Sequence, residues 1–584
     1  MFWKKSIAFL KRQWRPVWAP LIFFGSFTVW MTWPLATRLG SSIIGPGSGD
    51  NWYYVWLIGW FQKTLFELKQ NPLIVPFHNY PLGWNLAYTE ITLANVIPAL
   101  PISLLSNPTL AYNVILLLSF VLSGLVVYWW MAALTRSAAA GLVAGTLFAF
   151  APYRLAHLYG HLPLMGTQYL ALHFLGLHFL LQRRTLSGRY AALAGVGLGL
   201  AGLSSMYYLY MTLVVSAAYI LGFVLIAERK ALQRRAWWQN LLTMALIALP
   251  LIALATAPYL QLNAQGSTTG RSLYEVDLWS ASPTDFFLPA PVHFLWGKWI
   301  LTHFDRSAWI EQTLYIGAGT LLLVGAAVAV QKKTPEDAKL VKLLLFVSVC
   351  AMVLALGTTL HWFRDQVVFE IPEFIRPLLH RKLAPIPLPN YFLFKYLPFY
   401  NGMRTWMRYG IYANLFLAVL AGVGYARITS AFQGRAARSF ALALTLVLIG
   451  LDFSTIPYPT VEVQARPVDT WLAAQPGDGA FVQFPISQST QPEIVYATLV
   501  NNKPFLGMFY GAYLPKDFER IRPDLANFPS QKSVQILHDR GIKFVLVDSS
   551  QYQPWSMAKK QIETFGLREV HISDSQHVFE FSSP

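Results

Sequence analysis

Eleven long apolar runs constrain the fold of this chain more than any other feature of its sequence. Only 12% of the 584 residues are charged, about half the fraction found in soluble domains, which excludes a soluble enzyme and a disordered chain. A helix needs about 20 apolar residues to cross a bilayer, so the runs predict eleven membrane-spanning helices. They lie near residues 16–36, 110–134, 138–155, 163–183, 189–206, 208–227, 239–259, 311–330, 341–360, 405–426 and 438–456.

A further apolar stretch, residues 92–106, is short and contains Pro98 and Pro101. We interpret it as a re-entrant or interfacial segment. If it spans the membrane, the number of crossings becomes even, and the two chain ends lie on the same side.

Basic residues in the short loops set the expected orientation. Residues 1–15 hold five basic residues and no acidic one, and cytoplasmic loops are enriched in Lys and Arg. We expect a multi-pass protein of the bacterial cytoplasmic (inner) membrane, with a cytoplasmic N-terminus and an extracytoplasmic C-terminus. The run at 16–36 is too long for the apolar part of a signal peptide. The net charge of +17 then reflects topology, and we expect no nucleic-acid partner.

Three long loops are expected on the outer side, at residues 37–109, 260–310 and 361–404, and all are rich in aromatic residues and proline. Residues 52–69 are typical of an aromatic helix lying in the membrane interface. The third loop departs from the charge rule, which indicates either a different topology or an anionic partner. Its basic residues are Arg364, Arg376, Arg381, Lys382, Lys395 and Arg404.

The composition changes near Val461 to that of a small soluble domain. Residues 479–486, 543–550 and 577–582 are typical of strands, and residues 531–540 and 556–565 of helices. We therefore predict two domains, a helical transmembrane domain at 1–456 and an extracytoplasmic α/β domain at 457–584. The second domain carries no catalytic motif, so we interpret it as an accessory or substrate-recognition unit.

Asp50 is the leading candidate for a catalytic residue. It follows a glycine-rich loop (residues 45–49) and precedes the aromatic residues that begin at Trp52. A carboxylate that is poorly solvated at the membrane interface has a raised pKa, which suits a general base. The alternative is that Asp50 caps the helix that follows.

Glu90 is the second acid of interest in the first outer loop, just before the stretch 92–106. Asp50 and Glu90 are candidate ligands for a divalent cation, Mg²⁺ or Mn²⁺, that also contacts phosphate oxygens. The alternative for Glu90 is a favourable charge in the first turn of the next helix.

Basic residues at the outer ends of the apolar runs predict an anion-binding cavity. Arg154, His157 and His161 lie at the end of the third run, Arg404 and Arg408 lie at the start of the tenth run, and Arg271 lies in the second outer loop. Arginine makes bidentate contacts to phosphate. His157 and His161 also have metal-ligand spacing, but no carboxylate lies near them in sequence to complete a zinc site. The alternative for these residues is snorkelling to the membrane surface.

Two weaker features favour structural roles. Residues 197–202 match the dinucleotide-binding pattern of glycines, but they lie inside an apolar run, where small residues allow close helix packing. The single cysteine, Cys350, excludes an intramolecular disulfide and a cysteine-based zinc cluster.

The pattern of spans, outer-loop acid, aromatic segment and outer C-terminal domain resembles the GT-C superfamily of polytopic membrane glycosyltransferases. The resemblance extends to a poorly characterised bacterial set with a Tyr-Pro-x-Gly-x-x-Leu-Ala-Tyr-Thr-Glu stretch, here residues 80–90. That set also has an Ala-Tyr-Asn segment, here 111–113, and an Ala-Pro-Tyr-Arg-x-x-His segment, here 151–157.

The resemblance implies inverting transfer of a hexose or pentose from a polyprenyl-phosphate donor at the outer membrane face. It assigns the role of catalytic base to Asp50, and the acceptor is a lipid, a glycan or a protein. The chain departs from the family in having Asn51 after Asp50 and no Asp-x-Glu in the later outer loops. Alternative functions are a flippase or transporter of lipid-linked glycans, a glycan ligase or polymerase, and a non-catalytic envelope-assembly protein.

Overall fold

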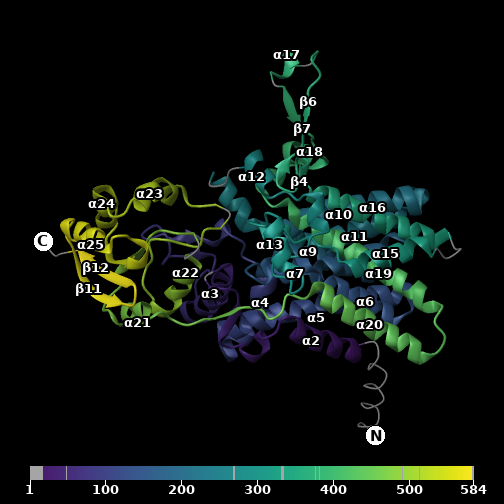
Figure 1. Cartoon of the computed structure of the whole chain (residues 1–584), viewed down its shortest axis with the longest axis horizontal. Helices are drawn as coiled ribbons and strands as arrows, with labels where there is room; N and C mark the ends of the chain where they lie inside the picture. The colour runs from purple at the N-terminus through teal and green to yellow at the C-terminus, as the bar shows by residue number, and fades with distance from the viewer. Residues whose placement is uncertain are drawn as a thin grey trace, which may run out of the picture.

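The computed structural model describes residues 17–47, 49–266, 270–330, 335–374, 376–380, 382–488, 491–511 and 513–581. The basic N-terminal stretch, Lys332, Lys333 and Arg381 lie outside these residues. Figure 1 shows a long body of helices, an α/β unit at one end that contains the C-terminus, and an arm that projects from one side of the body.

Each predicted apolar run contains a helix, which confirms the helical membrane class of the fold. Seven helical segments of the described chain are long and apolar enough to span a membrane, and four further apolar helices are shorter. The count of eleven crossings stays a prediction, as does the role of residues 92–106, which form the helix α4 (Leu93–Leu105). The eleven helices of the predicted runs are α2 (Ala19–Met31), α5 (Pro108–Thr135), α6 (Ala138–Ala149), α8 (Thr167–Leu181), α9 (Gly188–Ser204), α10 (Met206–Gly222), α11 (Arg235–Ala264), α15 (Ala318–Ala329), α16 (Pro335–Ala355), α19 (Gly410–Ser430) and α20 (Arg435–Phe453).

Two predicted runs are divided where they approach the outer loops. The run 138–155 ends as α6 at Ala149 and restarts as the short helix α7 (Pro152–His157), because a residue that precedes proline disfavours the helical conformation. The run 311–330 becomes α15 only from Ala318, and its first residues belong to the separate helix α14 (Trp309–Gln312). The segments next to both divisions carry polar side chains, among them His157 and Glu311.

The aromatic segment of the first loop forms the helix α3 (Asp50–Gln62), which continues as the π-helix η3 (Lys63–Leu68). Protein buries residues 51–61 on all sides of α3, so its aromatic residues serve packing within the molecule. Tyr53 stacks on Phe509 with ring centroids 4.0 Å apart. Trp56 donates its indole N–H to Thr498 Oγ1 at 3.1 Å, on the helix α22 (Gln491–Asn501). The helix is thus held between the membrane helices and the C-terminal unit.

The C-terminal unit is the expected α/β fold. Its sheet has the order β11 (Leu567–Ser573), β12 (Gln576–Phe581), β10 (Ile542–Asp548), β9 (Ala480–Phe484). The strands β9 and β10 are parallel, and the other neighbours are antiparallel. Three strands and the helices α24 (Gln531–Asp539) and α25 (Trp555–Thr564) were expected from the sequence, whereas β11 was not.

A small antiparallel sheet connects the C-terminal unit to the first outer loop. It pairs β1 (Ser42–Ile44) with β8 (Thr460–Glu462), with Ile43 opposite Val461. The pairing holds the chain on both sides of the predicted boundary at residues 456 and 457, and this boundary stays a prediction. Since β1 lies six residues before Asp50, the pairing also fixes the loop that carries this acid.

Gly59 allows α3 to approach α22 closely, and we predict that Gly59→Val destabilises the protein. A Cβ atom at this position would lie 2.7 Å from Leu499 Cδ1 and 3.2 Å from Pro108 Cγ. Overpacking of this kind costs about 1–3 kcal/mol, so thermal unfolding in detergent should occur at a lower temperature. The matched control is Gly25→Val in α2, where no atom lies within 4 Å. Equal unfolding temperatures for the two variants would contradict the prediction.

Candidate active site

Asp50 is the first residue of α3, with Gly49 as the N-cap residue. The segment that follows α7 packs against it, since a Cβ atom added to Gly160 would lie 3.3 Å from the Asp50 Cβ. Burial raises the pKa of Asp50 to about 6, although Arg404 and Arg408 act to lower it. A carboxylate with a pKa close to neutrality is suited to accept a proton from a hydroxyl.

Asn51 fixes the position of its neighbour Asp50. Its side-chain amide donates to the carbonyl oxygen of Leu158 at 3.3 Å and to that of Ile44, and its Oδ1 accepts a hydrogen bond from the Tyr112 hydroxyl at 2.6 Å. These three bonds join the first loop, α5 and the segment after α7. An amide both donates and accepts, so it makes a set of bonds that a second carboxylate could not make.

A buried ionic cluster lies beside Asp50 and joins three distant segments. The guanidinium of Arg408 contacts Glu311 Oε1 through Nη2 at 2.5 Å and through Nε at 3.1 Å. Glu311 Oε2 lies 3.3 Å from His157 Nε2. Burial alone would raise the pKa of Glu311, but Arg408 and His157 together hold it well below its usual range. Glu311 is therefore an anion that neutralises the Arg408 charge.

His157 stands between two hydrogen-bond acceptors. Its Nδ1 lies 2.7 Å from the carbonyl oxygen of Tyr153, and its Nε2 faces the Glu311 carboxylate. A neutral imidazole carries one N–H, so it cannot donate to both groups. Only one of the two acceptors can therefore be satisfied by the N–H of a neutral His157, and a cation held by the imidazole and the carboxylate would satisfy the other.

His161 completes a possible metal-ligand group. Ligand atoms of His157, His161 and Glu311 lie within 4.8 Å of one another. His161 Nδ1 is buried without a hydrogen-bond partner, and burial lowers the pKa of His161 to about 3, so the imidazole is neutral. Two histidines and a glutamate form the ligand set of many catalytic zinc sites, and the carbonyl of Tyr153 is a typical second partner for a ligating histidine. These residues fit a divalent cation.

The cation site expected at Asp50 and Glu90 stays a prediction. Among the described residues, His157, His161 and Glu311 form a separate group that could hold a metal ion, and neither Asp50 nor Glu90 belongs to it. Sequence analysis missed Glu311 because it lies 154 residues from His157 and begins an apolar run. The one signal in the sequence that could have identified Glu311 is its position as an acidic residue at the boundary of a predicted span.

Arginine side chains line a pocket of about 220 Å³ beside this cluster. Its walls include His161, Trp279, Glu311, Arg404 and Arg408. The guanidinium of Arg408 also lies 4.4 Å from the centre of the Tyr207 ring. The pocket is open to solvent. Arg404 and Arg408 in its wall both act to lower the pKa of Asp50, which is not itself among the lining residues.

Arg271 and Arg404 extend the positive charge away from the pocket. Arg271 pairs with Glu275 at 3.0 Å, and Arg404 lies 3.8 Å from the same carboxylate. The Arg271 guanidinium also lies over the Tyr513 ring, 4.6 Å from its centre. Tyr513 belongs to the C-terminal unit, so this unit reaches the edge of the candidate site.

Glu90 lines a second pocket, of about 230 Å³, together with Tyr207, Tyr259 and Tyr513. Its Oε1 accepts a hydrogen bond from the Ser205 hydroxyl at 2.6 Å. Burial raises the pKa of Glu90, and Arg408 opposes this shift. Arg408 therefore acts to lower the pKa of both Asp50 and Glu90.

Arg154 does not lie in either pocket, contrary to the expectation that it contacts a donor phosphate. Its side chain is completely buried, and its guanidinium donates to the Ala149 carbonyl, the Ser119 hydroxyl and the Met165 carbonyl. It also lies 4.1 Å from the centre of the Phe120 ring. The role of Arg154 is thus to hold the ends of the helices together beneath the site.

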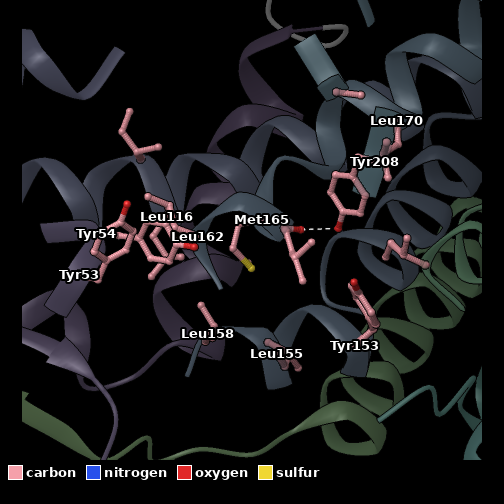
Figure 2. Close-up of a cluster of buried hydrophobic side chains, with 14 of the residues drawn as sticks. Tyr53, Tyr54, Leu116, Tyr153, Leu155, Leu158, Leu162, Met165, Leu170 and Tyr208 are labelled. Carbon is pink, nitrogen blue, oxygen red and sulfur yellow. Dashed lines mark hydrogen bonds between the residues drawn. The ribbon is translucent and has the colours of Figure 1, made fainter. Parts of the chain in front are cut away.

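An apolar layer supports the segment that carries the histidines. Figure 2 shows Tyr53 and Tyr54 of α3 on one side of Met165, and Tyr153 and Tyr208 on the other. The Tyr208 hydroxyl donates to the Leu164 carbonyl at 2.6 Å, which is the dashed bond in Figure 2. Dense packing of this kind holds His157 and His161 in place.

Comparison with known proteins identifies a family and a fold. Residues 48–381 match the family described as "Domain of unknown function (DUF6311)", and no curated protein matches the chain. Among solved structures, the Archaeoglobus fulgidus oligosaccharyltransferase in the apo form has a TM-score of 0.52 at 14% identity, over 93% of this chain and 70% of that one.

Two further solved structures are similar in fold. The arabinofuranosyltransferase AftD from Mycobacteria has a TM-score of 0.55 at 15% identity, and the match covers 97% of this chain but 41% of AftD. ArnT from Cupriavidus metallidurans has a TM-score of 0.50 at 10% identity, over 96% of this chain and 97% of ArnT. All three are membrane glycosyltransferases of the GT-C superfamily. The chain belongs to the DUF6311 family, and its fold is that of the GT-C membrane glycosyltransferases.

Proposed function

We propose that this protein is a membrane glycosyltransferase that moves a hexose or pentose from a polyprenyl-phosphate donor to an acceptor hydroxyl at the outer membrane face. The observation that carries the proposal is Asp50, a buried carboxylate with a pKa of about 6 on which Arg404 and Arg408, two arginines in the wall of a pocket, act electrostatically. The GT-C fold supports glycosyl transfer in general terms. The donor, the stereochemical course and the base belong to the proposal.

The helix α11 offers the lipid donor a route to the second pocket. The helix α11 exposes apolar side chains along its length, including Leu246, Leu249 and Leu254, and its outer end lines the second pocket through Tyr259 and Leu260. We place the polyprenyl chain along α11. The phosphate then lies at Arg404 and Arg408, with Arg271 farther out.

The reaction is a single displacement. Asp50 takes the proton of the acceptor hydroxyl, and the hydroxyl oxygen forms a bond to the anomeric carbon. The bond from that carbon to the phosphate oxygen breaks, and the polyprenyl phosphate leaves with the electron pair. Attack opposite the leaving group inverts the anomeric configuration. Arg404 and Arg408 stabilise the charge that develops on the phosphate.

A divalent cation is part of the proposal, with His157, His161 and Glu311 as its ligands. When bound, the cation would supply further positive charge for the leaving phosphate. The acceptor is a glycan, a lipid or a protein, and the C-terminal unit is positioned to contact it because Tyr513 borders the second pocket.

Asp50→Asn should abolish transfer without preventing folding. Loss of a general base lowers the rate by about 10²–10⁴-fold, and the amide has nearly the same shape as the carboxylate. The assay incubates protein in nanodiscs with radiolabelled polyprenyl-phosphate sugars and membrane extract, and follows label in acceptor or in free sugar. Asp478→Asn, at an exposed site of the C-terminal unit, is the matched control. A fully active Asp50→Asn protein would remove Asp50 from the mechanism.

The rate of transfer should rise with pH through about 6. Asp50 must be deprotonated to accept a proton, and its pKa is about 6. We expect kcat/KM to fall about tenfold for each pH unit below 6 and to reach a plateau above it. Measurements between pH 4.5 and 8, with unfolding monitored in parallel, test this. A profile that stays flat down to pH 4.5 would be inconsistent with Asp50 as the base.

Binding of a divalent cation should stabilise the protein against heat. We expect Mn²⁺ or Zn²⁺ to raise the unfolding temperature of protein treated with a chelator, and His161→Ala to remove this shift. His303→Ala is the control, because His303 is exposed and lies outside the ligand group. An identical shift in both variants, or no shift in the wild type, would exclude the proposed metal site.

A further inference from the structure

The third outer loop forms an arm that projects from the body of the protein. It contains the paired strands β4 (His361–Trp362) and β5 (Asp365–Gln366), then β6 (Val368–Glu370) paired with β7 (Leu383–Pro385), and the short helix α17 (Arg376–Leu379). In Figure 1 the arm stands clear of the body, and no other element lies beside its outer part.

Both faces of the arm expose large apolar side chains. Val368 and Phe369 are adjacent in β6, so they point to opposite faces, and each is 46% exposed. Phe374 is 83% exposed and Leu383 is 51% exposed. An isolated two-stranded ribbon is marginally stable in water, and exposed apolar patches mark interaction surfaces. The arm therefore requires an apolar or interfacial environment.

The point at which the arm leaves the body indicates that this apolar environment is the membrane surface. β4 begins six residues after α16 ends at Ala355, and six extended residues reach at most about 20 Å. α16 is one of the helices able to span the membrane. In Figure 1 the arm extends across the direction in which α10, α11 and α16 run. An element that runs across spanning helices near their ends lies along the membrane surface.

A neighbouring helix of the second loop continues the apolar surface of the arm. The helix α13 (Gly297–His303) exposes Trp299 and Leu301, and Trp296 precedes it. The rings of Phe304, which follows α13, and of Phe363 in the arm stack with centroids 5.5 Å apart. Tryptophan and other aromatic residues gather at membrane–water interfaces.

We propose that the arm and α13 together form a shelf that lies on the outer leaflet of the bilayer, with its aromatic side chains at the level of the headgroups. The exposed Lys382 and Lys395 are then close to lipid phosphates. This accounts for basic residues in a loop where the positive-inside rule predicts few. The proposal concerns how the protein contacts lipid, and it does not depend on the proposed catalytic activity.

The test uses single labelled cysteines. In a Cys350→Ala background, which removes the native thiol, Phe369→Cys, Phe374→Cys and the control Met557→Cys are labelled with an environment-sensitive fluorophore. Met557 is 69% exposed in the C-terminal unit. The proteins are placed in nanodiscs of phosphatidylcholine and phosphatidylglycerol, with or without lipids that carry a nitroxide quencher near the headgroup.

Contact with the bilayer predicts blue-shifted emission and at least twofold quenching at positions 369 and 374, and neither effect at position 557. Water-like emission without quenching at both arm positions would overturn the proposal. Blue-shifted emission that is insensitive to the nitroxide would also overturn it and indicate a second protein copy, which cross-linking would detect. If one substitution prevents folding, Trp362→Cys replaces it, because Trp362 lies in the same arm and is 57% exposed.

Discussion

The buried ion pair between Arg408 and Glu311 is the interaction on which the candidate site depends. Arg408 precedes α19, Glu311 lies in α14, and His157 ends α7, so one carboxylate joins three segments that are far apart in sequence. Removing one partner of a buried pair leaves an uncompensated charge, at a cost of about 3–5 kcal/mol. The pair is thus a structural requirement of the wall of the pocket.

The C-terminal unit also holds the candidate site together. It covers α3 through α22, pairs β8 with β1 on the loop before Asp50, and borders the second pocket through Tyr513. Each contact holds the outer end of the first loop, which carries the proposed base. An accessory role, as expected from the absence of a catalytic motif, is consistent with these contacts, since they position the base without supplying a reacting group.

Apolar periodicity and length predicted most of the fold, because burial in lipid or protein requires long apolar helices whatever their order in space. The residues that form the candidate site were harder to predict from the sequence than the fold. Arg154 and Arg408 are both arginines at the ends of apolar runs, but Arg154 is buried among protein acceptors while Arg408 lines a pocket. Residue type alone does not show which of the two arginines is buried in the protein and which lines a pocket. Glu311 was missed because only the folded chain brings it to His157, and Asn51 because its bonds join segments from three regions.

The geometry also indicates how donor binding would affect the base. Burial raises the pKa of Asp50, whereas Arg404 and Arg408 lower it through their positive charge. A donor phosphate held by these arginines would neutralise much of that charge, so the lowering influence would weaken while the effect of burial remained. Asp50 would then be a stronger base when the donor is bound than when the pocket is empty. Proton abstraction would therefore be more favourable when a sugar is in place to be transferred.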